Sequence, residues 1–480
     1  MIRLATIALI VSLFVRGFGF IDNPIPLGYD PGLYKDMFLE YAALGSQWDF
    51  TQLPPRIQSA YEPRLGMIGS VVQHLGIGFA DNRLTWGRVG ASIMIILGAY
   101  LLAGTIHKKV GLLALILVSL SFSQYAAYRW AYWKQILGLF LVCVTLRSRS
   151  KTNIRQTIPL LIAISLFNRA SATLLVFVGI VWGCILLYRR DYTVLVELLL
   201  SCFVAEMLFL PIMFPFIKTQ ILPIVQPFLS SIDLPTIQDG YQAGGTFLTT
   251  TEYLYTTRPI IITGLFGLGI LLWKRSHNLI IISSIILLLR VFGQGFFFQR
   301  MIGYLDIFLC ITAAYACYHL LDIKRGKLIV VGILALQSYY LWYGYRIIHP
   351  PIIEKQEFAF IKSIGTTLSG DSTIIVPGIW YSPWIKGRTD AQVLAPGLFD
   401  VNHWGDDSQG WMDYRYGKNA HTKCGNLAAE YPQLVNTPTY VWIGSKQPQT
   451  ESYSGGCFVR LSGSNLPPYS WYQIDWKRMK

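Results

Sequence analysis

Residues 157–188 read TIPLLIAISLFNRASATLLVFVGIVWGCILLY, an apolar run with one polar interruption at Asn168-Arg169. A single helix through this run would bury the Arg169 side chain near the centre of a lipid bilayer, which costs several kcal/mol. It would also reverse the side on which every later loop lies. We therefore predict two short spans, 156–168 and 170–188, with Arg169 at the outer surface between them.

The rest of the chain has the same apolar character. Of its 480 residues, 53% are hydrophobic and 14% are charged, whereas a typical soluble domain is about 25% charged.

Met1 to Phe20 lacks a small-residue cleavage site, which favours a retained span over a removed signal peptide. Each apolar stretch is long enough to cross a membrane as a helix. The predicted fold is an α-helical polytopic membrane protein with about eleven transmembrane helices, near 4–21, 84–106, 110–127, 130–146, 156–168, 170–188, 193–213, 259–273, 278–294, 301–321 and 327–348.

Basic residues gather in every second gap between these spans. Nearly the whole net charge of +14 comes from these gaps, which contain only Asp191 and Asp322 as acids. Because positive residues favour the cytoplasmic side, we expect a multi-pass protein of the plasma or inner membrane with its N-terminus in the cytoplasm. The charge then indicates topology and not nucleic-acid binding. The residues are Arg3, Lys108, Lys109, Arg147, Arg149, Lys151, Arg155, Arg189, Arg190, Lys274, Arg275, Lys324, Arg325 and Lys327.

Residues 350–480 form a second predicted domain, after a transmembrane domain at 1–349. They are polar, contain no run long enough to span, and lie outside the cell by the same topology. Short apolar runs predict strands, and a helical stripe precedes them, so we expect a mixed α/β fold. Cys424 and Cys457 are its only cysteines, and an oxidising compartment favours a disulfide between them over two free thiols. The runs are 373–376, 439–443 and 457–461, and the stripe is Phe358, Ile361, Ile364 and Leu368.

The first external loop, predicted at 22–83, contains an acid next to a helix start. Asp30 precedes Pro31, and apolar residues follow at helical spacing, which predicts an Asp N-cap and a surface helix over 31–45. Asp30 is either a helix cap only or a reactive carboxylate at the mouth of the membrane domain.

This loop resembles that of the GT-C superfamily, the integral-membrane glycosyltransferases that use lipid-linked sugar donors. In that superfamily the first external loop holds a catalytic acid, often with a tyrosine about four residues on, as in Asp30-Pro31-Gly32-Leu33-Tyr34 here. The run 123–135, SQYAAYRWAYWKQ, is similar to the aromatic and basic turn between spans three and four of many members. The resemblance implies a polyprenyl-phosphate-sugar donor and the ArnT-like architecture of glycosyltransferase family 39.

An outward-facing site supports the same interpretation. Nucleotide sugars are made in the cytoplasm, so the donor has to be carried in the membrane. Its phosphate leaving group calls for cations at headgroup level, although basic side chains at span ends also snorkel to lipid phosphates. Asp30 would act as general base on an acceptor hydroxyl, and direct displacement would invert the anomeric carbon. The candidate phosphate ligands are Lys134, Arg169, Arg300 and Arg129, with Arg290 nearby in the predicted topology.

Contacts to the sugar or the acceptor are expected from three places. Tyr34 lies in the first loop and Tyr128 in the turn between spans three and four. Asp239 and Glu252 lie in the external stretch 214–258, which is long and rich in proline and glycine. Connections of this length are often lids.

Metal dependence and two other functions stay open from the sequence. The chain has no Asp-x-Asp pair, which argues against a metal-dependent oligosaccharyltransferase-like mechanism, so no cofactor is assigned with certainty. The cluster of acids and a histidine at 400–407 leaves a divalent metal possible.

The alternatives to a glycosyltransferase of this kind are a glycan ligase or polymerase with a diphosphate-lipid donor, and a lipid or solute transporter. For a transporter, Glu197, Glu206 and Asp306 are the acids inside spans. The acceptor is a glycan, a lipid or a protein.

Overall fold

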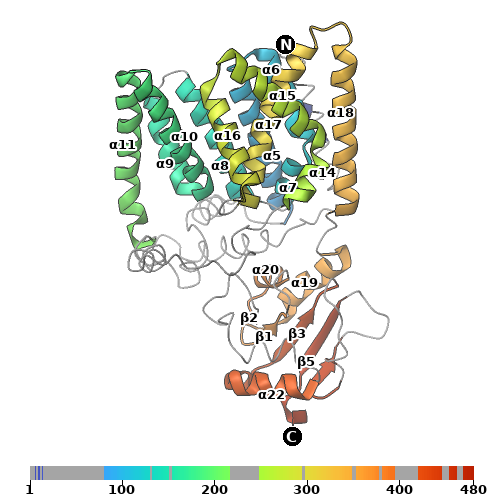
Figure 1. Ribbon diagram of the computed structural model, residues 1–480. Helices are drawn as coiled ribbons and strands as arrows, with labels where there is room; N and C mark the ends of the chain where they lie inside the picture. The colour runs from blue at the N-terminus through green and yellow to red at the C-terminus, as the bar shows by residue number, and fades with distance from the viewer. Residues whose placement is uncertain are drawn as a thin grey trace. The chain divides into compact units, whose positions relative to one another are not determined.

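The computed structural model divides into two compact units, described separately here (Figure 1). The first comprises Met1–Asp22 and Thr85–Pro350, and the second comprises Asn23–Leu84 and Pro351–Lys480. The structure describes residues 6, 9–10, 13–14, 81–129, 132–150, 154–216, 248–294, 298–348, 353–377, 381–394, 420–445, 453, 455–461 and 469–479.

The first unit is a bundle of helices. Every predicted span after the first overlaps a helix, and the described residues between 6 and 14 are helical. The predicted polytopic helical fold is therefore confirmed. The helices are α5 (Asp81–Ala103), α6 (Lys108–Leu120), α7 (Phe122–Arg129), α8 (Trp133–Ser150), α9 (Ile154–Phe167), α10 (Arg169–Tyr188), α11 (Tyr192–Phe216), α14 (Thr250–Thr256), α15 (Arg258–Lys274), α16 (Asn278–Phe292), α17 (Phe298–Leu320) and α18 (Gly326–Tyr343), which continues as the π-helical η3 (Gly344–Ile348).

Among the described residues, three helices are long and apolar enough by themselves to cross a membrane, namely 170–188, 298–320 and 326–346. Two further spans are bent. The predicted span 110–127 is present as α6 and α7, at 63° to each other, and α14 meets α15 at 87°. Counting each bent pair as one span gives up to five, and α5, α8, α11 and α16 contribute shorter apolar helices.

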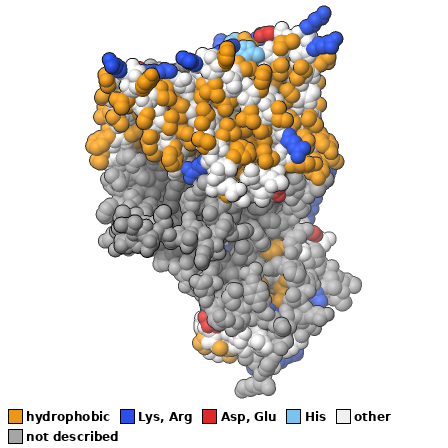
Figure 2. All heavy atoms as spheres, in the orientation of Figure 1, with side chains coloured by type: hydrophobic (Ala, Val, Ile, Leu, Met, Phe, Trp, Pro, Cys, Tyr) orange, Lys and Arg blue, Asp and Glu red, His pale blue; other side chains and the backbone are white. Residues whose placement is uncertain are grey.

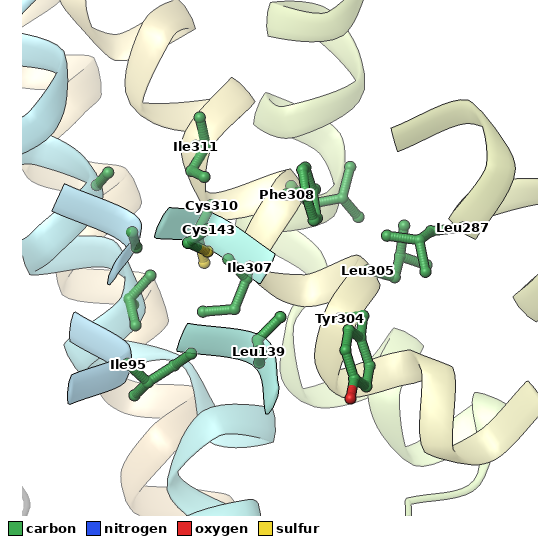
Figure 3. Close-up of a cluster of buried hydrophobic side chains, with 14 of the residues drawn as sticks. Ile95, Leu139, Cys143, Leu287, Tyr304, Leu305, Ile307, Phe308, Cys310 and Ile311 are labelled. Carbon is green, nitrogen blue, oxygen red and sulfur yellow. The ribbon is translucent and has the colours of Figure 1, made fainter. Parts of the chain in front are cut away.

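Helix α17 lies at the centre of this unit. Every residue from Met301 to Cys317 is buried, as expected for a helix that is apolar on all sides. Figure 3 shows its side chains packed against residues from neighbouring helices, including Ile95 of α5, Leu139 of α8 and Leu287 of α16. Helices α6, α7, α14, α15, α16 and α18 pack against this helix, whereas α9 and α11 pack against each other and against α10.

Charge and apolar surface are separated on the first unit. Figure 2 shows hydrophobic side chains over its visible face and Lys and Arg along one edge. The His107 ring, next to Lys108 in the chain, stacks on Tyr318 near the end of α17, and Lys274 Nζ lies 3.1 Å from His319 Nε2. Lys324 and Arg325 follow the end of α17 in the chain. Basic residues from gaps far apart in the sequence therefore share one edge, as the charge pattern predicted.

The second unit contains a five-stranded mixed sheet in the order β2-β1-β3-β5-β4. Strand β1 is parallel to β2 and β3, and β5 is antiparallel to β3 and β4, with Ile374 opposite Tyr440 and Trp442 opposite Trp471. The strands are β1 (Thr373–Ile375), β2 (Gln392–Leu394), β3 (Thr439–Ile443), β4 (Phe458–Arg460) and β5 (Ser470–Ile474); the helices are α19 (Lys355–Thr367), α20 (Ser382–Lys386), α22 (Ala420–Glu430), η4 (Pro432–Asn436) and η6 (Trp476–Met479). The predicted mixed α/β character is confirmed.

Both faces of this sheet are covered, because successive side chains of a strand point to opposite faces. Ile374 and Trp442 pack in a cluster with Ile361 of α19 and Trp384 of α20. Ile375 and Val441, their immediate neighbours in the strands, pack in a separate cluster with Leu427 of α22. Predicted strands 373–376, 439–443 and 457–461 correspond to β1, β3 and β4.

A disulfide joins Cys424 of α22 to Cys457, which directly precedes β4, with 6.5 Å between their Cα atoms. Replacing both cysteines with alanine should destabilise the second unit by about 3–4 kcal/mol, since the bond closes a loop of 33 residues in the unfolded chain. Hydrogen exchange of β3 and α22 amides in the full-length protein measures the loss. The control is Cys184→Ala, an exposed free cysteine of α10, which should leave exchange unchanged. Recovery of both cysteines as free thiols by non-reducing peptide mapping would contradict the bond.

Candidate functional site

The first turns of α8 and α17 lie side by side. The Gln135 side-chain amide of α8 donates a hydrogen bond of 2.9 Å to the main-chain carbonyl of Arg300 in α17. Lys134 is the second residue of α8 and Arg300 the third of α17. Two of the predicted phosphate ligands are thus brought to adjoining helix starts, although 166 positions separate them in the sequence.

The predicted break at Asn168-Arg169 is present and is fastened to the same part of α17. Asn168 is the N-cap of α10, and its side chain accepts a hydrogen bond of 2.9 Å from the Ser171 main-chain N–H. The Tyr304 hydroxyl of α17 donates to Asn168 Oδ1 over 3.1 Å and lies 2.6 Å from Ser171 Oγ. Arg169, the first residue of α10, therefore lies in the helix turn that contacts α17.

A glycine allows α8 to approach this break closely. A Cβ atom at Gly138 would overlap Ser171 Oγ and lie 2.6 Å from Asn168 Cβ. Gly138 follows Lys134 by one turn, so the contact fixes the distance between the starts of α8 and α10.

Gly138→Ala should therefore separate these two helix starts. Overpacking of this kind costs about 1–3 kcal/mol, and we expect a lower melting temperature together with weaker binding of the predicted polyprenyl-phosphate donor in detergent. Gly179→Ala on α10 is the matched control, because a Cβ there meets no atom within 4 Å and alanine favours the helix. Equal behaviour of the two variants would show that the close contact does not matter.

Helix α7 is attached to α17 as well. The Gln124 side-chain amide donates a hydrogen bond of 2.8 Å to the Gly303 carbonyl. Arg129 is the last residue of α7, so this predicted ligand is carried by a helix held against α17. The Tyr128 side chain is fully buried in the core of the first unit, and its predicted contact with substrate stays a prediction.

Two other predicted positions have structural contacts. Glu252 completes a capping box at the start of α14, where its carboxylate accepts hydrogen bonds from the Thr249 N–H at 2.8 Å and the Thr249 hydroxyl at 2.9 Å. Arg290 lies in the last turn of α16, with its guanidinium 5.7 Å from the centre of the Phe177 ring. A cation–π contact of this kind holds α16 against α10.

Asp30, Tyr34 and Asp239 lie outside the described residues, as does the acidic cluster at 400–407. Within the described part of the chain, no group of three or more His, Cys, Asp or Glu side chains is arranged to bind a metal.

The helix starts of α8, α10 and α17 together are suited to an anion. Each helix has a cation within its first three residues, and a helix N-terminus carries a partial positive charge. Sequence reasoning found these cations but not the residues that bring them together, Gln135, Gly138 and Tyr304. The available signal was a polar or small residue within one turn of a predicted ligand in an otherwise apolar helix.

Solved structures of two proteins share this fold. The chain matches ArnT from Cupriavidus metallidurans in the apo state (TM-score 0.60) and bound to undecaprenyl phosphate (TM-score 0.58), each at 11% identity over 98% of this chain and 97% of that chain. It also matches the Archaeoglobus fulgidus oligosaccharyltransferase in complex with Zn and sulfate, with TM-score 0.56 and 13% identity, over 99% of this chain and 73% of that one. No family model and no curated protein sequence matches the chain. The expected GT-C architecture is thus confirmed as a fold.

Proposed function

We propose that this chain, which has the GT-C fold, is a membrane glycosyltransferase that moves a sugar from a polyprenyl-phosphate donor to an acceptor hydroxyl on the extracytoplasmic face. One observation carries the proposal: Lys134, Arg169 and Arg300 stand at the starts of three helices that are hydrogen-bonded to one another through α17. The shared fold supports it, since one structure with that fold contains undecaprenyl phosphate.

The cations and helix starts would bind the donor phosphate and stabilise the charge that develops on it. As the glycosidic bond breaks, the phosphate oxygen takes both bonding electrons, and nearby positive groups lower the energy of that state. The helix starts are already held in place by hydrogen bonds, so little reorganisation is needed when the charge develops.

Asp30 would supply the base. Its carboxylate takes the proton of the acceptor hydroxyl while the hydroxyl oxygen bonds to the anomeric carbon. The phosphate leaves from the opposite face, so the configuration at that carbon inverts and polyprenyl phosphate is released. Tyr34, Tyr128, Asp239 and Glu252 are proposed to contact the sugar or the acceptor.

The proposal is tested with purified protein in detergent and a set of polyprenyl-phosphate sugars. Release of polyprenyl phosphate together with sugar transfer to an acceptor extract supports it. Transfer from diphosphate-linked donors alone would favour the glycan ligase alternative. Mass analysis of surface glycans from cells with and without the gene then identifies the sugar and the acceptor.

A further inference from the structure

A carboxylic acid lies in the interior of the first unit. Asp306 is fully buried in α17, and an ionisable residue inside a membrane span is costly enough to require a purpose. Two side chains donate to its Oδ2 atom: the Ser121 hydroxyl at 2.6 Å and the Gln124 amide at 2.9 Å. Both donors lie at the bend between α6 and α7, and 185 positions in the sequence separate Ser121 from Asp306.

These bonds determine how α7 begins. The Ser121 hydroxyl also accepts a hydrogen bond of 3.4 Å from the Gln124 main-chain N–H, as an N-cap residue does. The Ser121 hydroxyl donates its hydrogen bond to Asp306, so a lone pair of the Ser121 oxygen is directed toward α7. The same Gln124 amide reaches Gly303 one turn away on α17. The first turn of α7 is therefore held at two points of α17.

The second bent pair meets the same region. Helix α14 packs against α17, and its Tyr253 side chain is fully buried in the core of the first unit. The Gln337 amide of α18 donates to the Leu120 carbonyl at the end of α6 and to the Thr256 carbonyl at the end of α14, each over 3.3 Å. Broken helices within a membrane need hydrogen-bond donors for the carbonyls that the break frees. The Gln337 amide is such a donor at both breaks.

We propose that Asp306 is a positioning residue of the transfer site: it fixes α7, which carries Arg129 and leads into α8. This inference rests on the proposed function. Asp306 does not contact the donor in this scheme. It acts by accepting hydrogen bonds at a bend, and the bend sets where Arg129 stands relative to Arg300.

The test measures the KM for a polyprenyl-phosphate sugar, kcat and the melting temperature for Ser121→Ala, Gln124→Leu, Asp306→Asn and Asp306→Leu. Loss of one or two of these bonds should raise the donor KM by about three- to tenfold, with kcat changed less. Asp306→Asn retains one oxygen that can accept both donors, so it should restore most of the affinity that Asp306→Leu loses. Ser284→Ala is the matched control, because this buried hydroxyl of α16 bonds only within its own helix, to the Ile280 carbonyl.

A double-mutant cycle separates positioning from general stability. If Gln124 acts through Arg129, Gln124→Leu should have little further effect on KM in an Arg129→Ala background but its full effect in an Arg300→Ala background. Equal effects in both backgrounds, or a lower melting temperature with unchanged KM, would overturn the inference. Asp306→Asn as damaging as Asp306→Leu would also overturn it.

Failure of this inference can be told from failure of the proposed function. Active wild-type protein with an unchanged KM in Gln124→Leu would refute the positioning role alone. Wild-type protein that transfers no sugar from any polyprenyl-phosphate donor would refute both.

Discussion

Replacing Asp30 with asparagine is expected to lower sugar transfer by roughly 10²–10⁴-fold, the usual contribution of a general base. Asparagine caps a helix about as well as aspartate, so the predicted surface helix at 31–45 should be kept. Only the ability to take the acceptor proton is lost. The measurement is incorporation of sugar from a polyprenyl-phosphate donor, alongside donor binding and melting temperature, which should both match those of the wild type.

The control for Asp30 is Asp36→Asn, the same chemical change one to two turns further along the predicted helix, where transfer should be nearly unchanged. If Asp30→Asn turned over like the wild type, Asp30 would be a helix cap only. The weight of evidence would then move to the ligase-like alternative, which uses outer arginines and needs no acid in the first loop.

Arg300→Ala is expected to weaken donor binding and turnover together. A hydrogen bond to a charged group contributes about 1.5–3 kcal/mol, which corresponds to roughly a 10- to 150-fold change in the dissociation constant for the donor. Because the phosphate contact exists in both the ground state and the transition state, KM should rise, and any fall in kcat reports the extra charge that develops on the leaving group. Binding is measured with undecaprenyl phosphate and turnover with the sugar-loaded donor.

Lys327→Ala is the matched control for Arg300→Ala. Lys327 is exposed near the start of α18, beyond the C-terminal end of α17 at Leu320. The helical rise from Arg300 to Leu320 is about 30 Å. The control should bind and turn over donor like the wild type. Arg300→Ala with normal donor affinity would remove Arg300 from the phosphate site.

The positions of most helices of the first unit could be predicted from the sequence because hydrophobicity and charge are local properties of the chain. The apolar stretches between residues 84 and 348 predicted helices where α5 to α11 and α15 to α18 lie, whereas α14 lies in the stretch 214–258 that was predicted as a loop. The interruption at Asn168-Arg169 predicted the start of α10, since an unpaired charge inside a span is too costly to keep there. Short apolar runs likewise predicted β1, β3 and β4, and the two cysteines of the C-terminal domain indicated their own pairing.

Only the tertiary structure showed how the helix starts meet and that two spans bend. The contacts that unite the site join residues far apart in the chain, Gln135 to Arg300 across 165 positions and Ser171 to Tyr304 across 133. A hydropathy pattern shows that one face of a helix is buried. It does not show which distant residues pack against that face. Span 110–127 has the sequence of one apolar helix, yet it bends at Ser121, whose hydroxyl donates a hydrogen bond to Asp306 of α17. Sequence therefore determined which residues are helical and which carry charge, and three-dimensional packing decided which charges share a site.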